Sequence, residues 1–245
     1  MTIRIAAVGD VHMDGDVLGR FRPALHGIGD QADVLLLAGD LTRHGTESEA
    51  RCVATEFGDL AVPVIAVLGN HDHHCDQVPQ VVTVLTEAGI TVLEGDGMVL
   101  DLPGGRLGVA GVKGFGGGFA GRCASRFGEP EMKAFVGTTA DSADRLRAAL
   151  SELDCDVRVA LTHYSPVPET LAGEPLEIYP FLGSYLLAEA IDAEATDLAV
   201  HGHAHFGSER GSTPGGVRVR NVAHPVIKQA YSVFSLAGSV TRPDR

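Results

Sequence analysis

The sequence has no tryptophan, and aromatic residues make up only 5% of its 245 residues. Hydrophobic residues still account for 44% of the chain, so a substantial core is possible and should be aliphatic. Charged residues are only 21%, which excludes global disorder, because disordered chains combine high charge with low hydrophobicity. The length suits one large domain or two small ones.

Cysteine is also scarce. Cys52, Cys75, Cys123 and Cys155 are widely spaced and form no C-x-x-C pair, which favours isolated thiols in a reducing compartment. No apolar run approaches the length of a membrane span. The first apolar run ends at Gly9 and is too short for a signal peptide. We therefore expect a cytoplasmic protein without a membrane segment.

Positive charge is in deficit, since 19 lysines and arginines face 32 acidic residues and the formal net charge is −13. Proteins that bind long nucleic acids normally present a basic face, so that class of partner is not expected. A small phosphate ester remains compatible with the negative charge, because bound metal ions can reverse the sign of the field locally.

The first ninety residues alternate between short apolar runs and segments of helical spacing. Strands are predicted at 3–8, 34–38 and 64–68, and helices at 17–28, 46–59 and 79–88. This alternation predicts parallel strands joined by right-handed crossovers. Hairpins are expected from the runs at 90–93, 98–102 and 106–112. Helices follow at 138–153 and 184–193, and strands at 157–161, 197–200, 217–222 and 230–236.

No linker, repeat or low-complexity segment divides the chain. We therefore predict a single domain over residues 1–240 and a frayed C-terminal tail over residues 241–245.

Five predicted strands end in residue types that bind metal ions. In chain order these residues are Asp10 and His12, Asp40, Asn70, His163, and His203 with His205. Glycine precedes several of them, which suggests that the backbone turns sharply there. One such end is an ordinary polar turn, but five indicate a shared site, because open α/β sheets place their chemistry at the carboxyl ends of strands.

The donor types favour a particular chemistry. Carboxylate, imidazole and amide oxygen together suit divalent first-row metals. Seven ligands are too many for one ion and suit two ions roughly 3.5–4 Å apart with a carboxylate between them. Such a pair can hold a phosphoryl oxygen and generate a bridging hydroxide at neutral pH.

The polar strand ends form five blocks. They read Asp10-Val11-His12, Gly39-Asp40, Gly69-Asn70-His71-Asp72, His163 and Gly202-His203-Ala204-His205. In type and order the blocks resemble the D-x-H, G-D, G-N-H-[DE], H and G-H-x-H pattern of the calcineurin-like metallophosphoesterases, over residues 10 to 205. The resemblance implies an α/β fold, a four-layer α/β/β/α sandwich of two mixed β-sheets flanked by helices.

The resemblance also implies a role for each residue. Two divalent ions, Mn, Fe or Zn, are expected as cofactors. One would be held by Asp10, His12 and His205, the other by Asn70, His163 and His203, and Asp40 would bridge them. His71 would be catalytic, facing the phosphoryl group without binding metal, and Asp72 would be catalytic through orienting His71.

Residues beside the blocks have two interpretations each. Arg43 and His44 either reach a substrate phosphate or are simply exposed. The glycine-rich segment 111–121 is either a substrate-facing loop that carries Lys113, which we favour, or a flexible hairpin connection. His201 either packs at its strand end or supports a ligand. The proline-rich stretch after His163 forms either a cleft wall or a subunit contact, so a homo-oligomer stays open.

Differences between these motifs and those of other classes in the family narrow the range of expected substrates. Protein Ser/Thr phosphatases of this fold carry G-D-x-V-D-R-G and R-G-N-H-E, whereas here Thr42 stands in the first motif, Leu68 precedes the second and Asp72 ends it. Lipid A precursor hydrolases have arginine where His71 stands. The G-D-L-T and G-N-H-D forms resemble the bacterial class that cleaves cyclic nucleotides and other phosphodiesters.

The prediction is therefore metal-dependent hydrolysis of a small-molecule phosphodiester, of the cyclic nucleotide or glycerophosphodiester kind. One alternative is a phosphomonoesterase of broad specificity. Another is a non-catalytic metal-binding scaffold of the same fold, against which the intact set of ligands argues.

Overall fold

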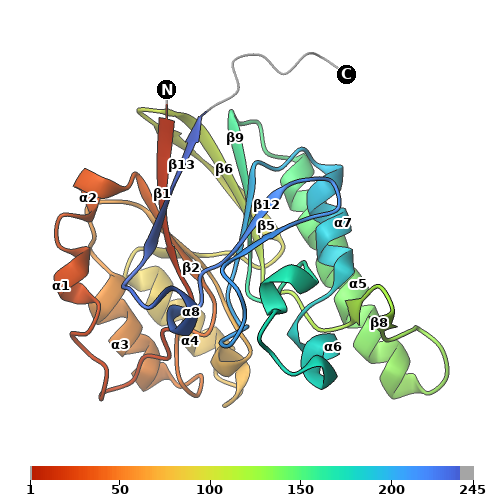
Figure 1. Ribbon diagram of the computed structural model, residues 1–245. Coiled ribbons are helices and arrows are strands. Elements are labelled where there is room, and N and C mark those ends of the chain that lie inside the picture. The colour runs from red at the N-terminus through yellow and green to blue at the C-terminus, as the bar shows by residue number, and fades with distance from the viewer. Residues whose placement is uncertain (1, 238–245) are drawn as a thin grey trace.

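Two large β-sheets pack face to face and carry helices on both outer faces, in a computed structural model that describes residues 2–237 (Figure 1). The predicted tail at 241–245 lies outside the described residues. The predicted four-layer α/β/β/α sandwich with two mixed sheets is confirmed. The first and last strands lie side by side, red and blue in Figure 1, and pair antiparallel.

The first sheet has the strand order β13-β1-β2-β3-β4. Its strands are Ser232–Ala237, Thr2–Val8, Val34–Ala38, Val64–Val67 and Ile90–Val92, in that order. Strands β1, β2 and β3 are parallel, as the alternation of strands and helices predicts, and β4 adds to them in parallel. Its outer face is covered by helices α1 (Arg22–Leu25), α2 (Ile28–Gln31), α3 (Glu47–Phe57) and α4 (Val78–Glu87).

The second sheet has the strand order β11-β12-β10-β9-β6-β5. Its strands are Arg210–Ser212, Arg218–Asn221, Leu198–His201, Val157–Thr162, Gly105–Val112 and Asp96–Leu102. Helices α5 (Pro130–Ser151) and α7 (Tyr185–Ala193) cover its outer face (Figure 1). Shorter elements lie around the sheet ends: β7 (Gly118–Phe119), β8 (Arg122–Cys123), α6 (Tyr179–Leu182), α8 (His224–Ile227) and the 3₁₀ turns His71–His73, Pro168–Leu171 and Leu176–Ile178.

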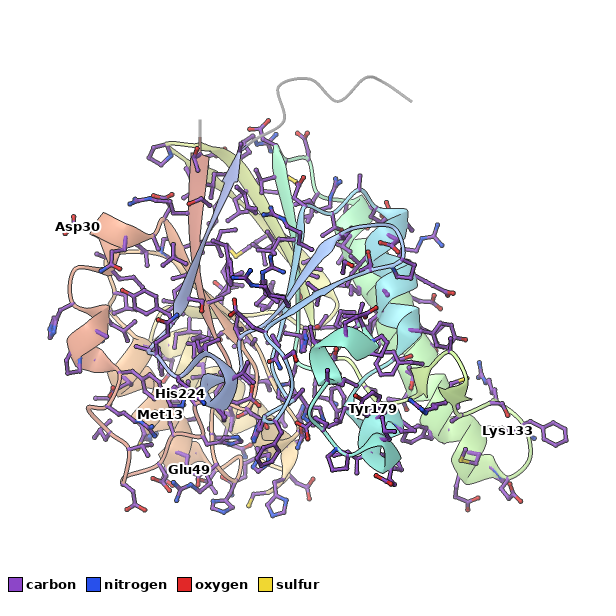
Figure 2. The ribbon with its side chains drawn as sticks, in the orientation of Figure 1. Met13, Asp30, Glu49, Lys133, Tyr179 and His224 are labelled. Carbon is purple, nitrogen blue, oxygen red and sulfur yellow. The ribbon has the colours of Figure 1, made fainter. Side chains whose placement is uncertain are left out.

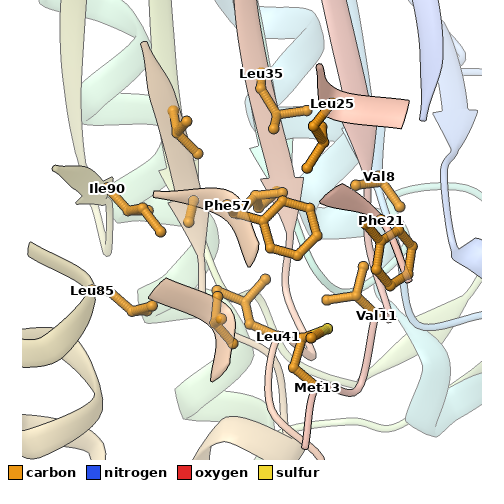
Figure 3. Close-up of a cluster of buried hydrophobic side chains, with 14 of the residues drawn as sticks. Val8, Val11, Met13, Phe21, Leu25, Leu35, Leu41, Phe57, Leu85 and Ile90 are labelled. Atoms are coloured by element: carbon orange, nitrogen blue, oxygen red, sulfur yellow. The ribbon is translucent and has the colours of Figure 1, made fainter. Parts of the chain in front are cut away.

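Three apolar layers hold these four layers of structure together. Strand β1 shows how they are built, because Ile3 and Ile5 face the second sheet while Ala6 and Val8 face the helices. A strand segment buried on both faces has no polar alternation, which explains the uninterrupted apolar run over residues 5–8 after Arg4. The layer under α1 to α4 is mainly aliphatic, and Phe21 is one of the few rings in it (Figure 3).

Local signals account for several boundaries. Thr46 forms the capping box of α3, since its hydroxyl accepts from the Glu49 N–H and the Glu49 carboxylate accepts from the Thr46 N–H. The prediction of one helix over 17–28 is wrong. Two four-residue helices stand in its place, separated at Gly27, whose φ is +74°. A left-handed residue interrupts the helical hydrogen bonds, so the segment turns there.

Other differences have tertiary causes. The run at 90–93 adds to the first sheet as the parallel partner of β3, whereas only β5 and β6 form the predicted hairpin. Helix α5 begins at Pro130, eight residues before the predicted start at 138. Its early turns are supported by Phe135, whose ring lies 5.1 Å from the Phe115 ring. Among residues 2–237 no helix combines the length and the apolarity needed to cross a membrane.

Candidate metal centre

The polar strand ends meet where β1, β2, β3, β9 and β10 finish. In Figure 2 the labelled residues near these loops, Met13, Glu49, His224 and Tyr179, all lie toward the lower end of the molecule. His71 begins the 3₁₀ turn that follows β3. The five predicted blocks are therefore brought to one place, as the rule for parallel strands requires.

The backbone is strained at several of the predicted ligands. Asp10, His12, Asp40 and His203 have φ values of +57°, +43°, +50° and +70°. A non-glycine residue in this region costs on the order of 1 kcal/mol or more and persists only when its surroundings hold it. Here neighbouring strand ends hold it, since the Asp10 N–H donates to the Gly39 carbonyl at 2.9 Å and the His12 N–H to the Asp40 carbonyl at 3.1 Å.

The glycines of the five blocks mainly allow neighbouring strand ends to approach closely. Of the four glycines that precede a ligand, only Gly39 has positive φ, at +80°. A Cβ on Gly69 would overlap the main-chain nitrogen and a carboxylate oxygen of Asp40. A Cβ on Gly202 would likewise overlap a carboxylate oxygen of Asp10. At Gly9 and Gly202 the positive φ belongs to the next residue, Asp10 or His203, so these glycines, like Gly69, allow strand ends to touch.

Two groups of candidate ligand atoms share one carboxylate. The first group contains Asp10, His12, Asp40 and His205, and the second contains Asp40, His163 and His203. Within each group one ligand atom per residue lies within 4.8 Å of all the others. The carboxylates and imidazoles divide as in the two expected ligand sets, with Asp40 common to both, but Asn70 is in neither group and the assignment of ligands stays a prediction.

The first group is closely packed. His205 Nε2 lies 2.8 Å from Asp10 Oδ1 and 3.5 Å from His12 Nε2. His12 Nε2 lies 3.9 Å from Asp40 Oδ2. Asp10 and Asp40 are buried, whereas the two imidazoles are partly exposed. The group is thus open on its imidazole side.

The second group has its tautomers set by main-chain carbonyls. His163 Nδ1–H donates to the Ala38 carbonyl at 2.9 Å, which leaves Nε2 with a lone pair. That nitrogen lies 3.0 Å from Asn70 Oδ1 and 3.3 Å from Asp40 Oδ1. His203 Nε2–H donates a hydrogen bond to the Phe181 carbonyl at 3.3 Å. The Nδ1 atom of His203 then carries the lone pair that could bind a metal ion. Lone pairs that converge in this way are matched by a cation placed between them.

The electrostatics also fit bound cations. Burial raises the pKa of Asp40 well above its ordinary value, and the charges of Asp10 and Asp72 raise it further. Burial lowers the pKa of His12 to about 4 and that of His203 to about 3, so both rings are neutral at pH 7, the form that binds metals. Among residues 2–237 no lysine or arginine pairs with Asp10 or Asp40. Divalent ions would supply the missing positive charge.

His71 lies beside these groups and belongs to neither of them. Its Nδ1–H donates to the Arg43 carbonyl at 2.7 Å, so the neutral ring presents its Nε2 lone pair away from that loop. The Nε2 atom is 3.9 Å from Asp40 Oδ2, and the side chain is 43% exposed. The ring packs edge-on against His12, with centroids 4.5 Å apart. His71 is thus a fixed and accessible imidazole at the edge of the cluster.

No hydrogen bond joins Asp72 to His71 among residues 2–237, so the expected orienting role of Asp72 has no direct contact behind it. The Asp72 carboxylate is fully buried and accepts from the main-chain N–H groups of Leu41, Thr42 and Gly69 and from the Thr42 hydroxyl. These donors saturate both oxygens, and the imidazole Nδ1–H donates to the Arg43 carbonyl instead. Asp72 ties the loop after β2 to the loop after β3, and its action on His71 through that connection stays a prediction.

Arg43 and His44, the suggested substrate contacts, pair with acidic side chains of the protein. The Arg43 guanidinium forms ion pairs with Asp14 and Asp16. His44 Nδ1 lies 2.8 Å from a carboxylate oxygen of Glu49. Both side chains remain partly exposed, at 39% and 55%.

Lys113 is held beside two aromatic rings. Its ammonium lies 5.0 Å from the Phe115 ring centroid and 5.3 Å from that of Tyr164. Burial lowers the pKa of Lys113, although the charges of Glu94 and Asp40 raise it. The segment 111–119 around it is mostly buried, and Gly117 donates to the Pro180 carbonyl at 2.6 Å. Residues 113–117 therefore form a packed loop, and contact of Lys113 with substrate stays a prediction.

Sequence reasoning missed the group that holds the G-H-A-H loop. Asn221, fully buried at the end of β12, donates to the Ala204 carbonyl at 2.8 Å and accepts from the Ala223 N–H at 3.1 Å. Its signal in the sequence was an amide at the end of a predicted strand. His201 lies between the Thr170 hydroxyl at 2.8 Å and the Gly202 carbonyl at 2.7 Å, and burial lowers its pKa to about 4.

Solved structures share this fold at low sequence identity. A phosphopantetheinyl hydrolase from Mycobacterium tuberculosis is 18% identical, with a TM-score of 0.65 over 89% of this chain and 88% of that chain. TT1561 of Thermus thermophilus is 17% identical, with a TM-score of 0.55 over 90% of this chain and 89% of that one. GAP50, the anchor in the inner membrane complex of Plasmodium, is 10% identical, with a TM-score of 0.54 over 91% of this chain and 72% of that one.

At these identities the likeness establishes the fold alone. A search among curated proteins finds no match. The family model for calcineurin-like phosphoesterases matches residues 3–207, which include all five blocks and both groups of candidate ligands. The chain therefore belongs to the calcineurin-like phosphoesterases, a family of metal-dependent phosphoester hydrolases.

Proposed function

We propose that this chain hydrolyses a small-molecule phosphodiester at the shared-carboxylate cluster. The observation that carries the proposal is the position of Asp40, common to two groups of candidate ligands, with an accessible imidazole 3.9 Å away on His71. A site for two ions with a separate acid–base group beside it suits phosphoryl transfer. The reaction develops negative charge on the phosphoryl oxygens, which metal ions stabilise, and the leaving alkoxide needs a proton.

The ligand sets follow from the two groups. Asp10, His12 and His205 are proposed to hold one ion, and Asn70, His163 and His203 the other, with Asp40 contacting both. The donors fit first-row divalent ions such as Mn, Fe or Zn. When bound, such ions supply Lewis acidity and a nucleophilic hydroxide at neutral pH.

His71 is proposed to act on the substrate directly. The Arg43 carbonyl fixes Nδ1–H, so Nε2 is the only ring atom available to the phosphoryl group or to the departing alkoxide oxygen. Protonated at Nε2, the ring would donate to that oxygen. The Lys113 ammonium is proposed to add positive charge near Asp40, whereas Arg43 contributes through its main chain.

The proposed setting is the cytoplasm, since no disulfide joins the four cysteines, all of which lie within residues 2–237. Neither an oligomeric partner nor a long nucleic acid is part of the proposal. The motif forms after β2 and β3 support a diester over a monoester. The non-catalytic alternative predicts that metals bind without turnover.

A paired assay tests the proposal. Bis-p-nitrophenyl phosphate and p-nitrophenyl phosphate are compared with Mn²⁺ supplied and the bound metal measured by elemental analysis. Turnover of the diester supports the proposal. Turnover of the monoester alone would overturn the diester preference, and two bound metals without turnover of any ester would favour the scaffold.

Two variants separate the roles. His71→Ala should keep both metals and lose roughly 10²–10⁴-fold in kcat, the range for a general acid–base group. Asp40→Ala should lose metal occupancy as well. His26→Ala, on the exposed end of α1, is the matched imidazole control and should change neither quantity. Full turnover by His71→Ala on an ester with a poor leaving group would exclude its proposed role.

A further inference from the structure

Three arginines lie together at the edge of the second sheet, in a chain whose formal net charge is −13. Arg210 of β11 is directly opposite Arg220 of β12, and Arg218 is two residues before Arg220 on the same strand. Directly opposite residues of an antiparallel pair point to the same face of the sheet, and so do residues two apart on one strand. The three side chains therefore start from one face.

That face is turned away from the helices. Val219, between Arg218 and Arg220, packs in the apolar layer that contains residues of α5 and α7. Successive residues of a strand point to opposite faces, so the arginines lie on the side of the first sheet. A cavity of about 410 Å³ opens there, and its lining includes Arg210 and Arg220 together with residues of α8 and β13.

The positive charge of the arginines is only partly compensated by the protein. Like charges directly opposite each other in a sheet are destabilising. Burial lowers the pKa of Arg220, and the charges of Arg210 and Arg218 lower it further, whereas Glu209 raises it. A carboxylate oxygen of Glu209 lies 3.9 Å from the Arg210 guanidinium. Among residues 2–237 no aspartate or glutamate forms an ion pair with Arg218 or Arg220, so two positive charges remain in excess.

The rest of the lining suits an organic molecule of opposite charge. The side-chain amide of Gln229 donates to the Ser232 hydroxyl at 3.0 Å, so the Ser232 O–H can donate to a bound oxygen. Val226, Ile227 and Phe234 add partly buried apolar surface to the same cavity. A cavity of this volume accepts a small organic molecule.

We propose that this cavity binds a phosphomonoester dianion that carries a small organic group. Guanidinium forks take phosphate oxygens in pairs, and a dianion matches the two positive charges in excess. The organic group lies against Phe234 and the apolar residues of α8. None of the candidate metal ligands lines the cavity, so the inference goes beyond the proposed function and does not depend on it.

Isothermal titration with phenylphosphonate tests the site. Above its second pKa this probe is a dianion with the shape of a phosphomonoester, and it has no phosphate ester bond that the protein could cleave. The Mn²⁺-loaded protein should bind it twice, at the cavity and at the metal centre. Arg210→Gln and Arg220→Gln should each weaken one binding event roughly 10- to 100-fold, because a hydrogen bond to a charged group is lost.

Two controls accompany the titration. Arg126→Gln removes an exposed arginine that does not line the cavity, and it should change neither binding event. Benzenesulfonate presents the same ring with a single negative charge, and it should bind the cavity roughly 10-fold more weakly. Turnover of a diester should be the same in all these variants and in the wild type, because none of the substituted arginines belongs to the metal centre.

A second measurement guards against misfolded variants. Without ligand, Arg220→Gln should have a Tm no lower than that of the wild type, because the substitution removes a repulsion. Phenylphosphonate should raise the Tm of the EDTA-treated wild type but not that of EDTA-treated Arg220→Gln, because a ligand that binds only the folded state stabilises it.

The remaining results would overturn the inference. A single binding event in the wild type, or two events that both persist in Arg210→Gln and Arg220→Gln, would exclude the site. An equal rise in Tm for the EDTA-treated wild type and Arg220→Gln would exclude it as well. Equal affinity for benzenesulfonate would exclude a dianion as the ligand. Absence of turnover for every ester would refute the proposed function and leave this inference intact, because the titration measures binding alone.

Discussion

Replacing Asp72 by asparagine tests how the two loops at the site are joined. In the folded protein Oδ1 of Asp72 accepts from the Thr42 N–H at 2.8 Å and the Thr42 hydroxyl at 2.6 Å. Oδ2 accepts from the Gly69 N–H at 2.7 Å and the Leu41 N–H at 3.2 Å. An asparagine places an N–H₂ group where one of these oxygens stands, so at least one buried main-chain N–H faces another donor.

The magnitude follows from the number of lost partners. A buried donor without an acceptor costs about 1–3 kcal/mol, and hydrogen bonds to a carboxylate are worth about 1.5–3 kcal/mol each. The negative charge of Asp72 repels that of Asp40 and raises the pKa of Asp40. Neutralising residue 72 removes this repulsion, which offsets part of the loss. The net loss in the free energy of unfolding for Asp72→Asn should be about 2–4 kcal/mol. For a chain of this size it corresponds to a decrease in Tm of about 5–15 °C.

The effect on turnover should accompany the effect on stability. A loosened loop after β2 moves the Arg43 carbonyl that orients His71, and loss of such a supporting contact costs about 10–100-fold in activity. Denaturant unfolding of the metal-free protein and steady-state kinetics of the Mn²⁺-loaded protein measure the two effects. Asp96→Asn is the matched control, because Asp96 is exposed and should change stability by less than about 0.5 kcal/mol.

One result would refute this reasoning. If Asp72→Asn lost turnover while its free energy of unfolding stayed within about 0.5 kcal/mol of wild type, Asp72 would act on His71 directly. The hydrogen bonds between the two loops would then not be what holds the imidazole in place.

Three further predictions concern the glycine, the helix cap and the metals. Gly69→Ala should lose metal and stability, because the new Cβ would overlap Asp40. Gly15→Ala is the control and should lose neither, because nothing lies within 4 Å of its Cβ position. Equal metal content in the two variants would contradict the close approach of Gly69 to Asp40. Burial raises the pKa of Glu49, but hydrogen bonds from His44 and the cap outweigh it and hold the pKa below its ordinary value of 4.5. The stability that the Glu49 carboxylate contributes is therefore complete above pH 4.5 and is lost at lower pH. The Tm difference between wild type and Glu49→Gln should shrink as the pH falls from 6 to 3. A constant difference would exclude this contribution. Removing metal with EDTA should abolish turnover and lower Tm, both restored by Mn²⁺, because binding to the folded state alone stabilises it; an unchanged Tm would argue against bound ions.

Much of the fold was predictable because its signals are local. The strand Val34–Ala38 has the predicted bounds, since a fully buried parallel strand reads as an uninterrupted apolar run. The cap at Thr46 and its partner Glu49 are three residues apart, so they interact wherever the chain folds. The convergence of ligands within each sheet was predictable for a related reason, because parallel strands of one sheet end on one side. Packing of the two sheets brings the ends of β9 and β10 to those of β1, β2 and β3.

The remaining errors concern local structure that distant parts of the chain decide. The helix predicted over 17–28 ignored the left-handed conformation of Gly27. The run at 90–93 has the pattern of a hairpin strand, yet it adds in parallel to β3, because an open sheet edge was available there. The glycine-rich segment is a loop over residues 113–117, as predicted, but the sequence did not indicate that it packs against residues 180–183, where small residues allow the backbones to approach.

By itself the sequence determined the order of the elements and which residues could serve as ligands. Both depend on residue type, on hydrophobic periodicity and on strand direction, all of which are present in the printed chain. Only the tertiary structure decided that Asp40 is common to two groups, that the Arg43 carbonyl holds His71, and that Asp72 binds the loop after β2. Contacts at this site join residues up to 195 positions apart, and their partners are chosen by packing geometry, which no local pattern encodes.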